Sequence, residues 1–171
     1  MAAARIVFYS ILAAVGYGIC HDLVTAHLCV EYFTVAHPFI FPSRSPVVMA
    51  LIWGILATWW VGLILGTGLA MAARAGAKPQ RTAPELLPEI VKLLKGMALF
   101  ACALGLVGYL CSVLHWIWLV PPLSRQIGSE SHNLFFFDAF AHTGSYLGGF
   151  LGGLWLMRKT WRERQLPPSR P

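Results

Sequence analysis

Four long stretches of apolar residues, almost free of charged side chains, constrain the fold of this chain more than any other feature. They run from about residue 4 to 24, 47 to 73, 96 to 120 and 134 to 157. The second and third hold no acidic or basic charge, and the fourth holds one acid, Asp138. A helix that crosses a bilayer needs about 20 apolar residues, and only helices or closed barrels satisfy their backbone groups in lipid. Because these runs lack strand alternation, they predict four membrane-spanning helices.

The composition agrees with this prediction. Apolar residues make up 57% of the chain and charged residues 12%, whereas soluble domains carry about 25% charged residues. We therefore predict an all-α fold, an integral membrane four-helix bundle that forms a single domain over residues 1–160. A disordered basic tail is expected over residues 161–171. The first stretch resembles the apolar part of a signal peptide but lacks a small-residue cleavage site, so we expect it to remain as a helix.

The distribution of Lys and Arg predicts the orientation of these helices. Eleven of the thirteen lie at the N-terminus, around the loop after the second stretch, or in the tail; the other two are Arg44 and Arg125. Cytoplasmic loops accumulate Lys and Arg, so we expect both termini in the cytoplasm and the chain in the inner (plasma) membrane. The net charge of +6 would then contact anionic lipid, which explains it without a nucleic acid partner.

Residues 84–95 form a separate pattern before the third stretch. Glu85, Glu89 and Lys92 share one helical face, and apolar side chains occupy the other. This spacing predicts an amphipathic segment at the cytoplasmic interface of the membrane.

Titratable side chains collect on the opposite, outer side. His21 and Asp22 lie near the outer end of the first helix, His115 near that of the third, and Asp138 and His142 near that of the fourth. Ionisable groups in hydrocarbon are costly, so they face the interior of a bundle and pair with one another. We therefore predict that these five side chains converge in one site in the outer half of the bundle.

Imidazoles and carboxylates are typical ligands of zinc and iron. We predict that two histidines and two aspartates bind a divalent metal, zinc or iron first: His21, Asp22, Asp138 and His142. Glu31 or His115 would act as a general base or would orient the ligands. Two alternatives stay open: Asp138 and His142, one helical turn apart, could neutralise each other as a structural pair, or the same groups could transfer protons.

The segment from residue 25 to 46 follows the first stretch on the outer side. Pro38, Pro42 and Pro46 prevent a long helix there, so this segment could fold over the site as a lid. His27 and Glu31 are typical of a solvated helical face, and the loop residues His37 and His132 are weaker candidates for ligands.

Glycines recur every fourth residue in two of the stretches. Gly62 and Gly66 lie in the second, and Gly144, Gly148 and Gly152 in the fourth. Small residues at this spacing let helix backbones approach closely. They predict tight packing, either inside the bundle or against a second copy or another membrane protein.

Two short runs resemble a known group of proteins. His21-Asp22-Leu23-Val24-Thr25 followed by Glu31-Tyr32-Phe33-Thr34, and the run from His142 to Gly149, are similar to motifs in small bacterial four-helix membrane proteins. That group has no assigned activity, so the resemblance implies a fold and a bacterial origin but no catalytic role.

Three functions are compatible with these patterns. The first is a metal-dependent membrane enzyme that works at the outer leaflet. The second is a component that transports protons or metal ions, although the inner halves of the four stretches offer few polar groups for a pathway. The third is an accessory or scaffold subunit, which would use the glycine faces but would not explain the charged groups in the outer leaflet.

Overall fold

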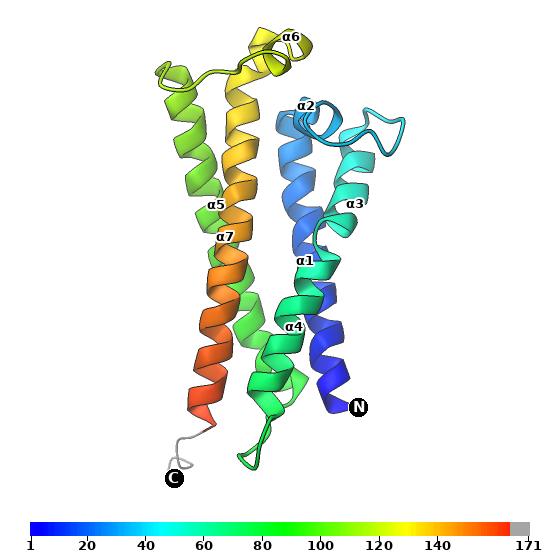
Figure 1. Ribbon diagram of the computed structural model, residues 1–171, viewed down its shortest axis with the longest axis vertical. Helices are drawn as coiled ribbons and strands as arrows, with labels where there is room; N and C mark the ends of the chain where they lie inside the picture. The colour runs from blue at the N-terminus through cyan, green and yellow to red at the C-terminus, as the bar shows by residue number, and fades with distance from the viewer. Residues whose placement is uncertain (165–171) are drawn as a thin grey trace.

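A computed structural model describes residues 1–164 of the chain, and every regular element within that range is a helix. Five long or medium helices build the body of the molecule (Figure 1): α1 (Ala2–Leu28), α3 (Pro46–Leu56), α4 (Trp59–Arg74), α5 (Ala83–Val113) and α7 (His132–Glu163). Three short elements lie in the connections: α2 (Val30–Thr34), α6 (Leu123–Gln126) and the 3-10 turn η1 (Ser129–Ser131). The all-α prediction is therefore confirmed for the described residues.

Within residues 1–164, three segments are long and apolar enough to cross a membrane, and α7, which contains the predicted fourth span, is not one of them. The three are α1, the continuous stretch of α3 and α4, and α5, with lengths of 27, 29 and 31 residues. Their surfaces carry large exposed apolar side chains, among them Leu99, Leu106 and Ile64. An exposed apolar surface of this kind is favourable in lipid and unfavourable in water. The chain therefore has the features of a membrane protein.

The long helices form two neighbouring pairs, if α3 and α4 are counted together as one interrupted helix. α1 packs along α3 and α4, whereas α5 packs along α7, and the pairs meet where α4 contacts α7 and α1 contacts α5. Figure 1 shows that the start of α1 and the end of α7 lie at one end of the bundle, while α2 and α6 lie at the other. We call the first the basic end, since Arg74 ends α4 there and Lys78 and Arg81 lie in the loop that follows, and we call the second the α2 end.

The second apolar stretch is divided into two helices, which the sequence did not predict. Residues 57 and 58 interrupt it, and the Thr58 hydroxyl donates a hydrogen bond of 2.5 Å to the Gly54 carbonyl. A Thr side chain that bonds back to the preceding turn often bends a helix. The bend occurs beside α1, where a Cβ on Gly18 would lie 2.6 Å from the Gly54 carbonyl oxygen.

α5 differs from the predicted third helix at both ends. It begins at Ala83 instead of residue 96, because the Thr82 backbone N–H donates to Glu85 Oε2 at 2.7 Å and caps the first turn. The amphipathic segment is thus the first part of α5. The helix ends at Val113 instead of residue 120, and His115 takes a left-handed conformation with φ of 57°.

α7 continues past its predicted end at residue 157 to Glu163, so the prediction of a disordered tail from residue 161 is wrong for residues 161–164. The physical reason is the buried guanidinium of Arg164, which bonds to backbone carbonyls around the end of α4. It donates to the carbonyl oxygens of Ala72, Ala75, Lys78 and Pro79 at 2.7 to 3.1 Å. The rest of the predicted tail, residues 165–171, lies outside the described residues.

The predicted glycine faces pack inside the bundle. A Cβ on Gly62 would lie 2.7 Å from Ile11 Cα, and one on Gly66 would lie 2.6 Å from Ser10 Cβ, so both glycines face α1. On α7, a Cβ on Gly144 would lie 2.9 Å from the Cα of Ala101 in α5. Tight internal packing is therefore confirmed at these three positions. Partners beyond the chain remain a prediction.

Candidate metal centre

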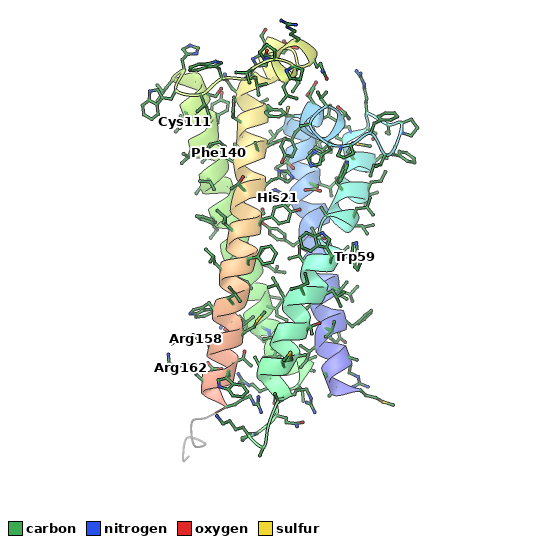
Figure 2. All side chains as sticks on the ribbon, in the orientation of Figure 1. His21, Trp59, Cys111, Phe140, Arg158 and Arg162 are labelled. Atoms are coloured by element: carbon green, nitrogen blue, oxygen red, sulfur yellow. The ribbon has the colours of Figure 1, made fainter. Side chains whose placement is uncertain are left out.

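Three of the side chains predicted as ligands gather between α1 and α7. Potential ligand atoms of His21, Asp22 and His142 all lie within 4.8 Å of one another. Figure 2 shows His21 between these two helices, in the half of the bundle nearer the α2 end. His21 and Asp22 are adjacent on α1, so the facing helix supplies the third member. All three are half-buried or buried.

The two nitrogens of His142 have different partners. Nδ1 lies 2.8 Å from the backbone carbonyl of Asp138, and Nε2 lies 3.3 Å from Oδ1 of Asp22. A carbonyl can only accept, so the first contact places the proton on Nδ1. In the neutral imidazole Nε2 then presents its lone pair, which is the arrangement usual for a histidine that binds a metal.

A short polar chain supports His21. The Ser145 hydroxyl lies 2.8 Å from the Tyr17 hydroxyl and 3.4 Å from Nδ1 of His21. The Tyr17 ring stacks on the His21 ring at 5.8 Å between centroids. Sequence reasoning missed both residues, although a signal was present: Tyr17 lies one turn before His21, and Ser145 lies three residues after His142.

The segment predicted as a lid does contact the site. The Tyr32 ring on α2 lies 4.5 Å from the His142 ring, and that of Phe33 lies 5.5 Å from it. His37, in the loop after α2, has its ring 4.6 Å from Trp53 and its Nδ1 2.8 Å from the Tyr32 carbonyl. Burial lowers the pKa of His37, so the imidazole favours its neutral form beside the cluster.

A cavity of about 150 Å³ opens beside the three side chains. His21, Asp22 and His142 contribute to its wall, as do Tyr32 and His37 from the lid. Ser145 and Tyr17 also line it. A ligand in the cavity would therefore reach the cluster directly.

Asp138 does not join the group, although the sequence predicted it as a ligand. Its side chain is fully buried, and neither carboxyl oxygen has a hydrogen-bond partner among the described residues. It shares a face with His142, but the His142 ring bonds to its backbone carbonyl and pairs with Asp22 instead. The predicted Asp138–His142 side-chain pair is therefore replaced by an Asp22–His142 pair between helices.

His115 also lies away from the group. It follows the end of α5, its side chain is exposed, and it is not among the three side chains of the group. The early end of α5 explains the difference, because the sequence placed His115 inside a helix.

Glu31 is half-buried on α2 and is not among the described residues that line the cavity. Its Oε2 accepts a contact of 3.5 Å from the Cys29 thiol. Burial raises the pKa of Cys29 to about 12, so this sulfur stays protonated. A role for Glu31 as a general base remains a prediction.

The two weaker histidine candidates have other partners. His27 is exposed on α1, and its Nδ1 lies 2.6 Å from the Leu23 carbonyl. His132 begins α7, with Nε2 3.1 Å from the Ile127 carbonyl. Neither belongs to the group of three.

Two imidazoles and one carboxylate are a ligand set that both zinc and iron use. Catalytic zinc sites have three protein ligands and an open position, and non-haem iron sites with two histidines and one carboxylate also keep open positions. Ligands about 2.1 Å from one ion cannot be more than about 4.2 Å apart. The side chains would therefore move slightly closer on binding.

Comparison with family models, with curated proteins and with solved structures finds no match to this chain.

Proposed function

We propose that this chain is a metal-dependent enzyme of the inner (plasma) membrane, with a zinc or iron ion held by His21, Asp22 and His142 in the outer half of a four-span bundle. The observation that carries the proposal is the convergence of three ligand-type side chains from two helices at the wall of a cavity.

The membrane placement is supported by the helices and by the charges. α7 would be the fourth span: it has 32 residues and runs beside α5. The basic residues at the start of α1, after α4 and at the end of α7 lie at one end of the bundle (Figure 1). That end would face the cytoplasm, since cytoplasmic segments are rich in Lys and Arg. The cluster would then lie in the outer leaflet.

The chemistry follows from the ligand set and its position. A divalent ion with three protein ligands can polarise an oxygen of a bound substrate or activate a water molecule. The His142 Nδ1 contact with the Asp138 carbonyl would hold the ring in the orientation for binding. The carboxylate of Asp22 would offset part of the charge of the ion, which matters in a medium of low dielectric constant.

A second explanation of the same contacts is an ion pair between protonated His142 and Asp22, with no metal. It accounts for the distance of 3.3 Å between them, but it does not explain why His21 also turns its ring toward His142, at 4.7 Å between ring centroids. Two imidazoles and one carboxylate fit a divalent ion better than they fit a single proton.

Metal analysis tests the proposal directly. The protein is purified in detergent without a polyhistidine tag, and its metal content is measured by mass spectrometry of the elements. We expect about one zinc or iron ion per chain. His142→Ala and Asp22→Ala should each remove most of it.

His27→Ala is the matched control, because His27 lies on the same helix as His21 but outside the group. It should retain the metal of the wild type. A wild-type protein that folds and contains no metal would contradict the proposal and leave the ion pair as the explanation.

A further inference from the structure

The cavity beside the cluster is long and extends far from the polar side chains. On α1 its wall runs from Asp22 to Ser10, and on α7 from His142 to Leu156. At a rise of about 1.5 Å per residue, these segments measure about 18 Å and about 21 Å. One leaflet of a bilayer contributes about half of a hydrocarbon core of about 30 Å. The lining residues therefore span at least the length of the apolar chain of a lipid in one leaflet, and because the cavity is only partly enclosed, such a chain would lie partly outside its enclosed volume of about 150 Å³.

The two ends of the cavity differ in chemistry. At the α2 end, its wall carries the three histidines His21, His37 and His142, with Asp22 and several hydroxyl groups. Toward the basic end the wall is mostly aliphatic, with Leu65, Leu69, Ile90, Leu93 and Leu156. The Ser10 hydroxyl also lies there, but it donates its hydrogen bond to the Ile6 carbonyl. A ligand that matches both ends has one small polar head and one long apolar tail.

The charges of the side chains that line the cavity limit which polar head groups a ligand could have. The titratable side chains that line the cavity are histidines, tyrosines and one acid, and no Lys or Arg is among the described lining residues. A phosphate group would therefore lack the Arg or Lys partner that it usually has, and only a bound ion could take that place. A carboxylate, carbonyl or hydroxyl oxygen could instead contact the imidazoles, the hydroxyls of Tyr17 and Ser145, or a bound ion.

We propose that this cavity binds a lipid with a single long apolar chain, acyl or prenyl, whose oxygen-bearing head lies at His21, Asp22 and His142. This inference deepens the proposed function by naming its substrate class. The proposed position of the lipid head rests on the metal-dependent function. The proposed position of the lipid's apolar chain does not, because the aliphatic wall exists whether or not a metal binds.

The position of the chain can be tested by photolabelling. A palmitic acid derivative and a geranylgeraniol derivative, each with a diazirine at the far end of its chain, are added to the purified protein and irradiated, and the labelled peptides are identified by mass spectrometry. At least one probe should label the region of Leu69, Ile90 or Leu156, the buried aliphatic end of the cavity. The probe that labels distinguishes an acyl from a prenyl chain.

Labelling is compared between a variant whose cavity is blocked and a control variant with the same substitution outside the cavity. Ala13→Phe places a ring inside the cavity, whereas Ala103→Phe adds the same ring on an exposed position of α5. Label at the aliphatic end should be lost in Ala13→Phe and kept in Ala103→Phe. Val61→Phe blocks the cavity from the α4 wall and serves as a second variant, with elution from size-exclusion chromatography reporting the fold of each.

Two results would overturn the inference. One is label confined to exposed faces such as Leu99 and Leu151, which would reflect contact with bulk lipid. The other is label at the aliphatic end that persists in both folded blocking variants. Metal content measured in the same samples separates the two proposals: specific label without metal would refute the metal-dependent function alone, and metal without specific label would refute the lipid site alone.

Discussion

Nε2 of His142 lies 3.3 Å from Oδ1 of Asp22, across the boundary between α7 and α1, and both side chains are largely buried, with 13% and 7% of their surface exposed. This contact joins the two helix pairs of the bundle near the α2 end. It also brings together two groups that are 120 residues apart in the chain.

The Asp22–His142 contact should couple the two residues energetically. Removing one partner of a buried pair leaves the other without compensation, at a cost of about 3–5 kcal/mol. We expect Asp22→Leu and His142→Leu each to lower the unfolding free energy by an amount in this range. The double variant should lose less unfolding free energy than the sum of the two single losses. Thermal unfolding of all four proteins in detergent, with a chelator present, measures this double-mutant cycle. If the two losses add within about 0.5 kcal/mol, the pair is uncoupled.

Asp138 should be dispensable for metal binding and unfavourable for stability. Its carboxyl group is fully buried and has no hydrogen-bond partner within residues 1–164, and such a group costs about 1–3 kcal/mol. Asp138→Leu should therefore stabilise the protein by a similar amount and keep its metal content. Asp138→Asn, which retains a buried polar group, should gain less. A loss of metal in both variants would instead make Asp138 a ligand.

Position 62 should not tolerate a side chain larger than that of glycine, whereas position 16 should tolerate one. A Cβ at position 62 would lie 2.7 Å from the Cα of Ile11, an atom of the facing backbone, while one at position 16 would have no neighbour within 4 Å in the described part of the chain. We expect Gly62→Ala to destabilise the protein by about 1–3 kcal/mol. Gly16→Ala should be neutral or stabilise it by up to about 1 kcal/mol. Equal melting temperatures for the two variants would contradict the close approach of α1 and α4.

Arg164 should stabilise the basic end more than its neighbour Arg162. The Arg164 guanidinium is buried and donates to four carbonyl oxygens, whereas Arg162 is exposed near the end of α7 (Figure 2). Arg164→Ala should cost about 2–3 kcal/mol, the contribution of one or two charge-assisted hydrogen bonds. Arg164→Lys should rescue little of this, because an ammonium group lacks the planar fork. If Arg162→Ala costs as much in a thermal melt, the network contributes nothing specific.

The proposed orientation can be measured with reporter fusions. The sequence assigns eleven of the thirteen Lys and Arg residues to segments predicted to be cytoplasmic. Alkaline phosphatase is active only on the periplasmic side of the inner membrane. It should therefore be inactive when fused after Pro171. Inserted at Ser43, in the loop between α2 and α3, it should be active. The opposite pattern would invert the orientation and move the cluster to the cytoplasmic leaflet.

The sequence by itself determined the helical class and the approximate position of the polar site. Only helices and closed barrels satisfy the hydrogen bonds of the backbone in lipid, and long apolar runs without strand alternation leave the helix. The positions of His21, Asp22 and His142 near the same ends of their helices placed them at one depth. The glycines at positions 62, 66 and 144 indicated close helix packing, because a missing side chain is visible in the sequence itself.

Only the tertiary structure decided which of these side chains meet. Spacing along one helix suggested that His142 pairs with Asp138, but the preference of the His142 Nδ1 for the carbonyl one turn back directs Nε2 toward α1 and Asp22. The early end of α5 removed His115 from the group, and the bend at Thr58 shaped the wall of the cavity. These outcomes depend on how helices rotate and pack against each other, and contacts between residues distant in the chain leave no local pattern.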